Sequence, residues 1–166
     1  MQLDVPTYVQ LQVLAYVGLA MLLGALVGVD REMAHKPAGL RTHMLVSGAS
    51  ALLVALGEIL VQRFDASLRH TAVQTDPLRV MGAVITGVIF LGAGTIIRHD
   101  SDDRVEGITT AASLFMAAAV GITVALSRLV LAVGLTLFTL MILRGLNSLT
   151  RWIARRGADH TSHLER

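Results

Sequence analysis

The chain has 166 residues, of which 54% are hydrophobic and 16% charged, with a net charge of +2 and a mean hydropathy of +0.64. A soluble domain carries about 25% charged residues, so this apolar excess is too large for one soluble core. The chain has no cysteine, which excludes disulfides, thiolate catalysis and cysteine-based metal sites.

Five apolar runs predict five transmembrane helices, and they cover residues 11–29, 44–61, 80–97, 108–126 and 129–144. The first run has 19 residues and as a helix spans about 28 Å, close to the roughly 30 Å of hydrocarbon in a bilayer. Because backbone polar groups in lipid must be satisfied within the segment, each run is expected to be helical. The sequence therefore predicts an all-α polytopic membrane protein. Its transmembrane domain would cover residues 1–144, and a short polar cytosolic tail would follow at 145–166.

Positive charges are distributed unevenly between the two ends of the predicted helices. Ten of the 14 Lys and Arg residues fall on one side and four on the other. Since Lys and Arg in short loops favour the cytosol, the N-terminus is expected outside and the C-terminus in the cytosol. Arginines beside apolar runs also indicate contact with the lipid bilayer rather than with nucleic acid. The cytosolic ten are Arg31, Lys36, Arg41, Arg98, Arg104, Arg144, Arg151, Arg155, Arg156 and Arg166, and the external four are Arg63, Arg69, Arg79 and Arg128.

A weak internal repeat relates two parts of the chain at a shift of 68 residues. Leu23-Gly24-Ala25 falls on Leu91-Gly92-Ala93, and Gly39-Leu40-Arg41-Thr42 falls on Gly107-Ile108-Thr109-Thr110. A true duplication would make two similar helical hairpins, related by an axis along the membrane normal, with the fifth helix as an addition. Small residues are common in this chain, so chance coincidence is the alternative.

Small residues spaced four apart recur in the apolar runs, beginning with the pair Gly24 and Gly28. Such spacing lets helix backbones approach closely, and packing drives helix association in lipid. Plain helix packing is the favoured interpretation, and room for a ligand or a partner helix is the alternative. We also expect a homo-oligomer, in its simplest form a dimer. The glycines assigned to helix packing are Gly24, Gly28, Gly87, Gly92 and Gly94.

Two polar segments lie at the predicted cytosolic ends of helices, and we expect them to meet because the loops after helices 1 and 3 face the same side. In the second segment Thr109 and Ser113 share a helix face. Hydroxyls beside helix N-terminal amides can hold a polar group, although helix capping and interfacial anchoring would explain the same residues. The polar cluster comprises Asp30, Arg31, Glu32, Lys36, Arg41, Thr42, His43, Glu106, Thr109, Thr110 and Ser113.

Carboxylates at this end are candidate ligands for Mg²⁺, which prefers oxygen donors, and Asp30 and Glu32 are the metal candidates. No carboxylate lies at the centre of a predicted helix, where an ion pathway most often shows itself. This argues against a dedicated ion-conducting path. The chain contains no P-loop, no GxSxG and no paired catalytic acids. We therefore assign no catalytic residue, predict no enzyme, and expect no cofactor other than Mg²⁺.

Three ordered blocks resemble the membrane domain of the MgtC/SapB family. They are Gly24–Glu32 continuing through Lys36–His43, Asp76–Val80 with Gly87–Thr95, and Gly107–Ser113. The chain resembles a short form that lacks the soluble C-terminal domain of longer members. It departs from the family pattern at Glu106, where a basic residue is usual, and at Gly82, where a polar residue is usual.

The resemblance implies a bacterial inner-membrane protein linked to magnesium homeostasis, to adaptation to low Mg²⁺ and, in pathogens, to virulence. A regulatory role through contacts with another membrane complex is the favoured expectation. The membrane part of the F-type ATP synthase is then the implied partner. The alternative is transport of Mg²⁺ or another divalent cation.

Overall fold

Helices account for nearly all of the described chain in the computed structural model, which describes residues 5–67, 77–99 and 104–161. The helices are α1 (Thr7–Met33), α2 (Leu40–Ser67), α3 (Pro77–Ala93), α4 (Ile108–Ala125) and α5 (Leu129–Thr161). The predicted all-α class with five helices is confirmed. Asp76, Arg69 and the end of the predicted tail at 162–166 lie outside the described residues.

Within the described residues, three helices are long and apolar enough to cross a membrane. They are α1, the segment Leu40–Val61 of α2, and α4. The apolar parts of α3 and α5, Leu78–Ala93 and Leu129–Gly145, are shorter. Many large apolar side chains of α3 and α5 are exposed, among them Phe90 and Val130. Exposure of this extent is what a bilayer would cover, since lipid tails are as apolar as these side chains.

Helices α1 and α2 extend several residues beyond the expected apolar runs at both ends, and α3 begins at Pro77 rather than at residue 80. Two other boundaries differ for reasons that the structure shows. Helix α3 ends at Ala93 rather than at residue 97, because Thr95 closes a turn in which its backbone N–H and its hydroxyl both donate to the Gly92 carbonyl oxygen, at 2.9 and 2.7 Å. The chain then enters a two-stranded antiparallel hairpin of β1 (Ile97–His99) and β2 (Arg104–Glu106). At the other end of the chain, α5 continues through Gly145 to Thr161 instead of ending near residue 144. A single Gly in a helix costs only about 1 kcal/mol relative to Ala, too little to end it.

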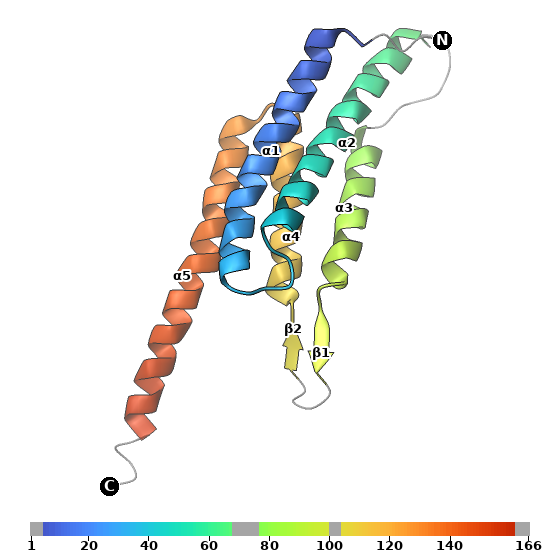
Figure 1. The fold of residues 1–166 in the computed structure, drawn as a ribbon. Coiled ribbons are helices and arrows are strands. Elements are labelled where there is room, and N and C mark those ends of the chain that lie inside the picture. Colours follow the sequence, from blue (N-terminus) through green and yellow to red (C-terminus); the bar gives the residue numbers. More distant parts are fainter. Residues whose placement is uncertain (1–4, 68–76, 100–103, 162–166) are drawn as a thin grey trace.

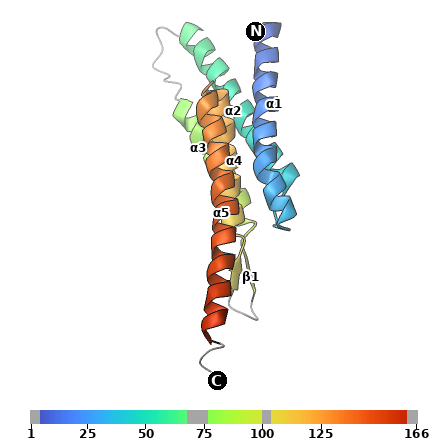
Figure 2. The ribbon, with the colours of Figure 1, turned by 90° about the vertical axis from the view of Figure 1, so that its left-hand side faces the viewer.

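Helix α4 occupies the middle of the bundle and contacts each of the other four helices. Helix α2 lies beside it and contacts α1 and α3, while α5 packs against α4 and α1. In Figure 1, α3 and α5 lie on opposite sides of the bundle, and Figure 2 shows the same elements after a quarter turn. The α1–α2 connection, the strands β1 and β2 and the C-terminal half of α5 all lie at one end (Figure 1). The elements that carry the polar cluster are therefore gathered at that end.

The core is built from small side chains, which permits this close packing. One group of buried residues includes Ala20 of α1, Ala51 of α2, Val124 of α4 and Ala132 of α5. A second group joins α2, α3 and α4 through residues such as Val46, Val88 and Ala117. Small interfacial residues let helix backbones approach, which favours association where no hydrophobic effect operates between helices.

The glycines assigned to packing fall into two sets. A Cβ added at Gly24 would lie 2.6 Å from the His43 carbonyl oxygen, and one at Gly28 would lie 2.7 Å from the Leu40 Cα. A Cβ at Gly92 would lie 3.3 Å from the Ala111 Cβ. These three glycines therefore sit at close helix contacts. Gly87 has open space around it, and Gly94 faces only carbonyl oxygens of its own chain segment at Phe90 and Leu91, so neither makes such a contact.

The 68-residue shift recurs in the structure. Helices α2 and α4 begin at Leu40 and Ile108, and each follows a glycine. The close contact of Gly24 with His43 has its counterpart in the contact of Gly92 with Ala111 at the same shift. Helices α1–α2 and α3–α4 are thus two hairpins with the same internal contact, and α5 has no counterpart in the second hairpin.

Candidate functional site

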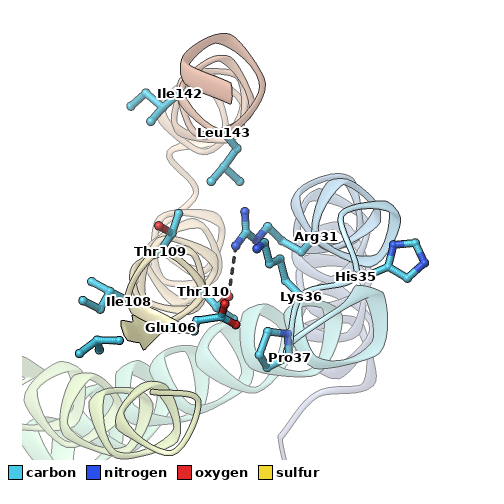
Figure 3. Close-up of a pocket in the computed structure, with 12 residues that line it drawn as sticks. Arg31, His35, Lys36, Pro37, Glu106, Ile108, Thr109, Thr110, Ile142 and Leu143 are labelled. Carbon is cyan, nitrogen blue, oxygen red and sulfur yellow. Dashed lines mark hydrogen bonds between the residues drawn. The ribbon is translucent and has the colours of Figure 1, made fainter. Parts of the chain in front are cut away.

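Arg31 is the central charged residue of the polar cluster. It stands in the last turn of α1, yet only 3% of its surface is exposed. Its Nη2 donates a hydrogen bond of 3.1 Å to the Thr110 hydroxyl in the first turn of α4, and its Nε is buried without a hydrogen-bond partner. Figure 3 shows the guanidinium in the space between α1 and α4, with Leu143 of α5 pointing toward it. A buried N–H without a partner is costly, and this nitrogen stays unsatisfied among the described residues.

A second buried contact joins α2 to α4 beside Arg31. The fully buried His43 ring makes contacts of 2.8 Å from Nδ1 to the Gly39 carbonyl oxygen and 3.0 Å from Nε2 to the Ser113 hydroxyl. A carbonyl only accepts, so Nδ1 carries the proton and Nε2 of the neutral ring accepts from Ser113. The Ser113 hydroxyl also lies 2.8 Å from the Thr110 carbonyl oxygen, so its one proton serves two acceptors. Ser113 and Thr110 therefore link α1, α2 and α4 through polar contacts.

The two carboxylates named as metal candidates face different elements. Glu32 reaches across the α1–α2 connection, and its Oε2 accepts a hydrogen bond of 2.9 Å from the Leu40 backbone N–H. This places a negative charge at the start of α2, where the helix dipole favours one. Asp30 instead pairs with Arg144 of α5, with 2.8 Å between Oδ1 and Nε. Both carboxylates are thus engaged in contacts that join helices.

A pocket of about 800 Å³ opens beside Arg31, between the α1–α2 connection, the start of α4 and the middle of α5. Of the polar cluster, five residues line it: Arg31, Lys36, Glu106, Thr109 and Thr110. His35 and Pro37 add to the wall, and Ile108, Ile142 and Leu143 give it an apolar side (Figure 3). The two polar segments therefore meet as predicted, and residues from both line the same pocket.

The remaining members of the polar cluster lie outside this pocket. Arg41 is exposed and Thr42 half-buried on the first turn of α2. His43 and Ser113 are buried in the bundle just behind Arg31 and Thr110. Asp30 and Glu32 flank Arg31 but point toward α5 and α2.

Sequence reasoning missed the contribution of α5 to the site. Arg144 pairs with Asp30, and its neighbours Ile142 and Leu143 line the pocket. One signal was available, because five alternating helices bring the end of the fifth to the same face as the end of the first. Gly107 was also missed: its φ of 95° lies in the left-handed region, and a Cβ there would overlap the Thr95 carbonyl oxygen. Only glycine meets both conditions without strain.

In the described part of the chain, five helices with apolar outer faces and a polar cluster at one end, which is buried at Arg31, His43, Thr110 and Ser113, define a polytopic helical membrane protein. The family model described as the MgtC family matches residues 17–152, and the chain belongs to that family. The predicted family resemblance is thereby confirmed. No solved structure matches the chain.

Named relatives extend this comparison. The chain is 34% identical to the protein SapB of Bacillus subtilis over 115 residues, which are 69% of this chain and 48% of SapB. It is 34% identical over 132 residues to YhiD of Escherichia coli, whose name describes it as a candidate magnesium transporter, covering 80% of this chain and 59% of YhiD. It is 36% identical to MgtC of Brucella abortus over 103 residues, 62% of this chain and 38% of MgtC. The chain thus spans about half the length of SapB and YhiD.

Proposed function

We propose that this chain is a magnesium-linked regulatory protein of the bacterial inner membrane that acts through contact with another membrane complex. The magnesium link is taken from the family and from the name of YhiD. In this proposal the polar cluster faces the cytosol, as does the C-terminus, and the N-terminus is outside. The excess of Lys and Arg at the end that carries the polar cluster supports this orientation.

The proposal rests on the positive charge of Arg31, which is buried within the polar cluster. Arg31 puts a buried positive charge among the polar residues, whereas a conducted cation needs carboxylate or carbonyl oxygens, and like charges repel strongly where water is excluded. Asp30 and Glu32, its neighbours in the chain, are held by Arg144 and by the Leu40 N–H. These contacts support a site that holds the helices together and contributes to a surface for another membrane protein, rather than one that conducts Mg²⁺.

An apolar groove between α2 and α3 is the proposed contact for a partner helix. It encloses about 470 Å³ and is lined by small residues such as Ala49, Ala83 and Gly87, with Val88 and Leu91. The 68-residue shift maps Val88 and Leu91 onto Ala20 and Leu23 of α1. Those two residues belong to the core group that α5 completes through Ala132. The groove is therefore the counterpart of a surface that a helix already covers in the first hairpin.

Site-specific crosslinking tests this contact. Because the chain has no native cysteine, an introduced cysteine is its single thiol. Gly87→Cys places a thiol in open space within the groove, and Gly134→Cys places one in open space on α5 as a matched control. A photoreactive maleimide on Gly87→Cys, activated in native membranes, should yield adducts with a second membrane protein that Gly134→Cys does not yield. The membrane part of the F-type ATP synthase is the first candidate for mass spectrometry.

Two results would count against this proposal. Adducts only between copies of this chain would assign the groove to a homo-oligomer. Equal adduct patterns from Gly87→Cys and Gly134→Cys would remove the groove as a specific contact.

Transport of Mg²⁺ is the second candidate function, favoured by the name of YhiD and by the position of Asp30 and Glu32 at one end of the bundle. Purified protein in liposomes would then carry Mg²⁺ inward, measured with an entrapped indicator. Asp30→Asn and Glu32→Gln would each reduce the flux. Flux no greater than that of empty liposomes would exclude transport by this chain alone.

A further inference from the structure

The pocket beside Arg31 presents a buried cation with an unused donor. Arg31 is almost fully buried and lines the pocket. Nη2 is bound to Thr110, but Nε has no partner. Arginine is a common partner of phosphate and carboxylate oxygens because its planar donors match their geometry. The residue that lines the pocket therefore carries a donor without an acceptor among the described residues.

The N-terminus of α4 contributes a second set of donors to the same wall. Residues Gly107 to Thr110 line the pocket, and the Gly107 cap provides no side-chain hydrogen bond. The first N–H groups of an α-helix have no acceptor within the helix, and the dipole gives this end partial positive charge. The first turn of α4 and Arg31 of α1 thus line one cavity from two different helices.

The charge of the lining limits what the pocket can hold. Arg31 and Lys36 are positive and Glu106 is negative, so the lining has one excess positive charge when His35 is neutral. Outside the lining, Asp30 and Arg144 compensate each other. A singly charged oxyanion would match this balance. The apolar side formed by Ile108, Ile142 and Leu143 would adjoin the first methylenes of an acyl chain if the anion belonged to a lipid.

We propose that this pocket binds a singly charged phosphate oxyanion through the Arg31 guanidinium, the N-terminal turn of α4 and Lys36. The inference rests on the proposed function, and it assigns a ligand to the polar cluster of that proposal. Two sources share this chemistry: the phosphodiester of an anionic phospholipid headgroup, and free monobasic phosphate. Basic pockets among membrane helices near the cytosolic surface commonly hold anionic headgroups.

The test measures ligand-induced stabilisation of the purified full chain in a nonionic detergent. The probes are dihexanoyl phosphatidylglycerol and inorganic phosphate at pH 6, each titrated at constant ionic strength. Dihexanoyl phosphatidylcholine and chloride serve as controls. A ligand that binds only the folded state raises Tm as its concentration exceeds Kd, so the titration yields Kd. Lys36→Gln removes an exposed charge of the pocket, and Arg41→Gln removes an exposed charge at the same end of the bundle that does not line it.

We expect at least one anionic probe to raise Tm beyond its control. Lys36→Gln should weaken that probe's Kd by roughly three- to tenfold, as expected for one charge-assisted contact at an exposed position, while Arg41→Gln leaves Kd unchanged. Arg31→Lys keeps the charge but loses the fork and should weaken Kd by about tenfold or more. A response to phosphatidylglycerol alone assigns the lipid, and a response to phosphate alone assigns the free anion.

Either of two results would overturn the anion site. One is that neither probe raises Tm more than its control does. The other is that Lys36→Gln and Arg41→Gln weaken binding equally, which would indicate diffuse surface charge. The binding assay contains no partner protein, so a negative result in it would not affect the Gly87→Cys crosslinks that test the proposed function. Likewise, a lack of specific crosslinks would not affect the evidence for anion binding.

Discussion

Arg31 and Thr110 stand 79 residues apart in the chain, and the hydrogen bond between Nη2 and Oγ1 joins the end of α1 to the start of α4. Two apolar helices are thereby joined through a buried cation and a hydroxyl. The neighbouring contact of His43 with Ser113, 70 residues apart, joins α2 to the same helix. Helix α4 is thus the element on which the polar cluster is assembled.

Removing the Thr110 hydroxyl should destabilise the fold. Thr110→Val keeps the shape of the side chain but leaves the Arg31 guanidinium short of an acceptor, which should lower the free energy of unfolding by about 1–3 kcal/mol. Thr109→Val is the matched control, since Thr109 is exposed beside it and should change stability by less than about 0.5 kcal/mol. Denaturant titration of the detergent-solubilised chain measures both. Equal losses would mean that the Arg31 contact contributes nothing.

The His43–Ser113 contact should appear as a coupling energy. In a double-mutant cycle of His43→Leu and Ser113→Ala, the two losses should be non-additive by about 0.5–3 kcal/mol because each variant removes the partner of the other. Ser50→Ala is the control partner, since the Ser50 hydroxyl donates to the Val46 carbonyl oxygen of its own helix. Its effect should add to that of His43→Leu within about 0.5 kcal/mol. Full additivity with Ser113→Ala would contradict the contact.

A methyl group at Gly121 should not be accommodated. Its Cβ would overlap the Ser47 carbonyl oxygen of α2, where the two backbones are in contact. Gly121→Ala should therefore cost about 1–3 kcal/mol, as overpacking does. Gly134→Ala, in open space on α5, should be neutral or stabilising by up to about 1 kcal/mol through helix propensity. Thermal denaturation measures the stability of both variants. A Gly121→Ala variant as stable as the wild-type chain would refute close α2–α4 packing.

Glu32 should behave as a helix cap and not as a metal ligand. Glu32→Ala removes the acceptor of the Leu40 N–H and should cost about 1 kcal/mol. Glu32→Gln keeps an acceptor, loses the dipole interaction, and should cost about 0.3–1 kcal/mol. Stability of the wild-type chain should not change when EDTA replaces Mg²⁺. A loss of Tm in EDTA that both variants abolish would instead establish Glu32 as a ligand.

Single-cysteine labelling tests the proposed orientation. Lys36→Cys and Arg128→Cys both place a thiol at an exposed position, one on the α1–α2 connection and one at the α4–α5 turn. In intact spheroplasts, a membrane-impermeant maleimide should label Arg128→Cys and spare Lys36→Cys. Permeabilised cells should label both. The opposite pattern in intact spheroplasts would invert the assigned sidedness.

Much of the architecture was available from local sequence. The apolar runs predict the helices and their alternation because a segment in lipid must satisfy its own backbone and match the bilayer thickness. Alternation in turn predicts that Asp30–His43 and Glu106–Ser113 share one end of the bundle, as the structure shows. The glycines before α2 and α4 likewise anticipate two hairpins with matching contacts.

Contacts between distant segments required the tertiary structure. Hydropathy does not distinguish the glycine that meets a neighbouring backbone, as Gly24 does, from the glycine that faces open space, as Gly87 does. Nor does it predict that Asp30 turns to Arg144 while Glu32 turns to Leu40.

The sequence by itself determined that this chain forms apolar helices with its polar residues at their ends, because that pattern depends on each segment's own exchange with lipid. Only the tertiary structure decided that Arg31 is buried against Thr110 with one donor left unused. Burial of that kind depends on how α1, α4 and α5 rotate about their axes, and their rotation is set by packing among all the helices.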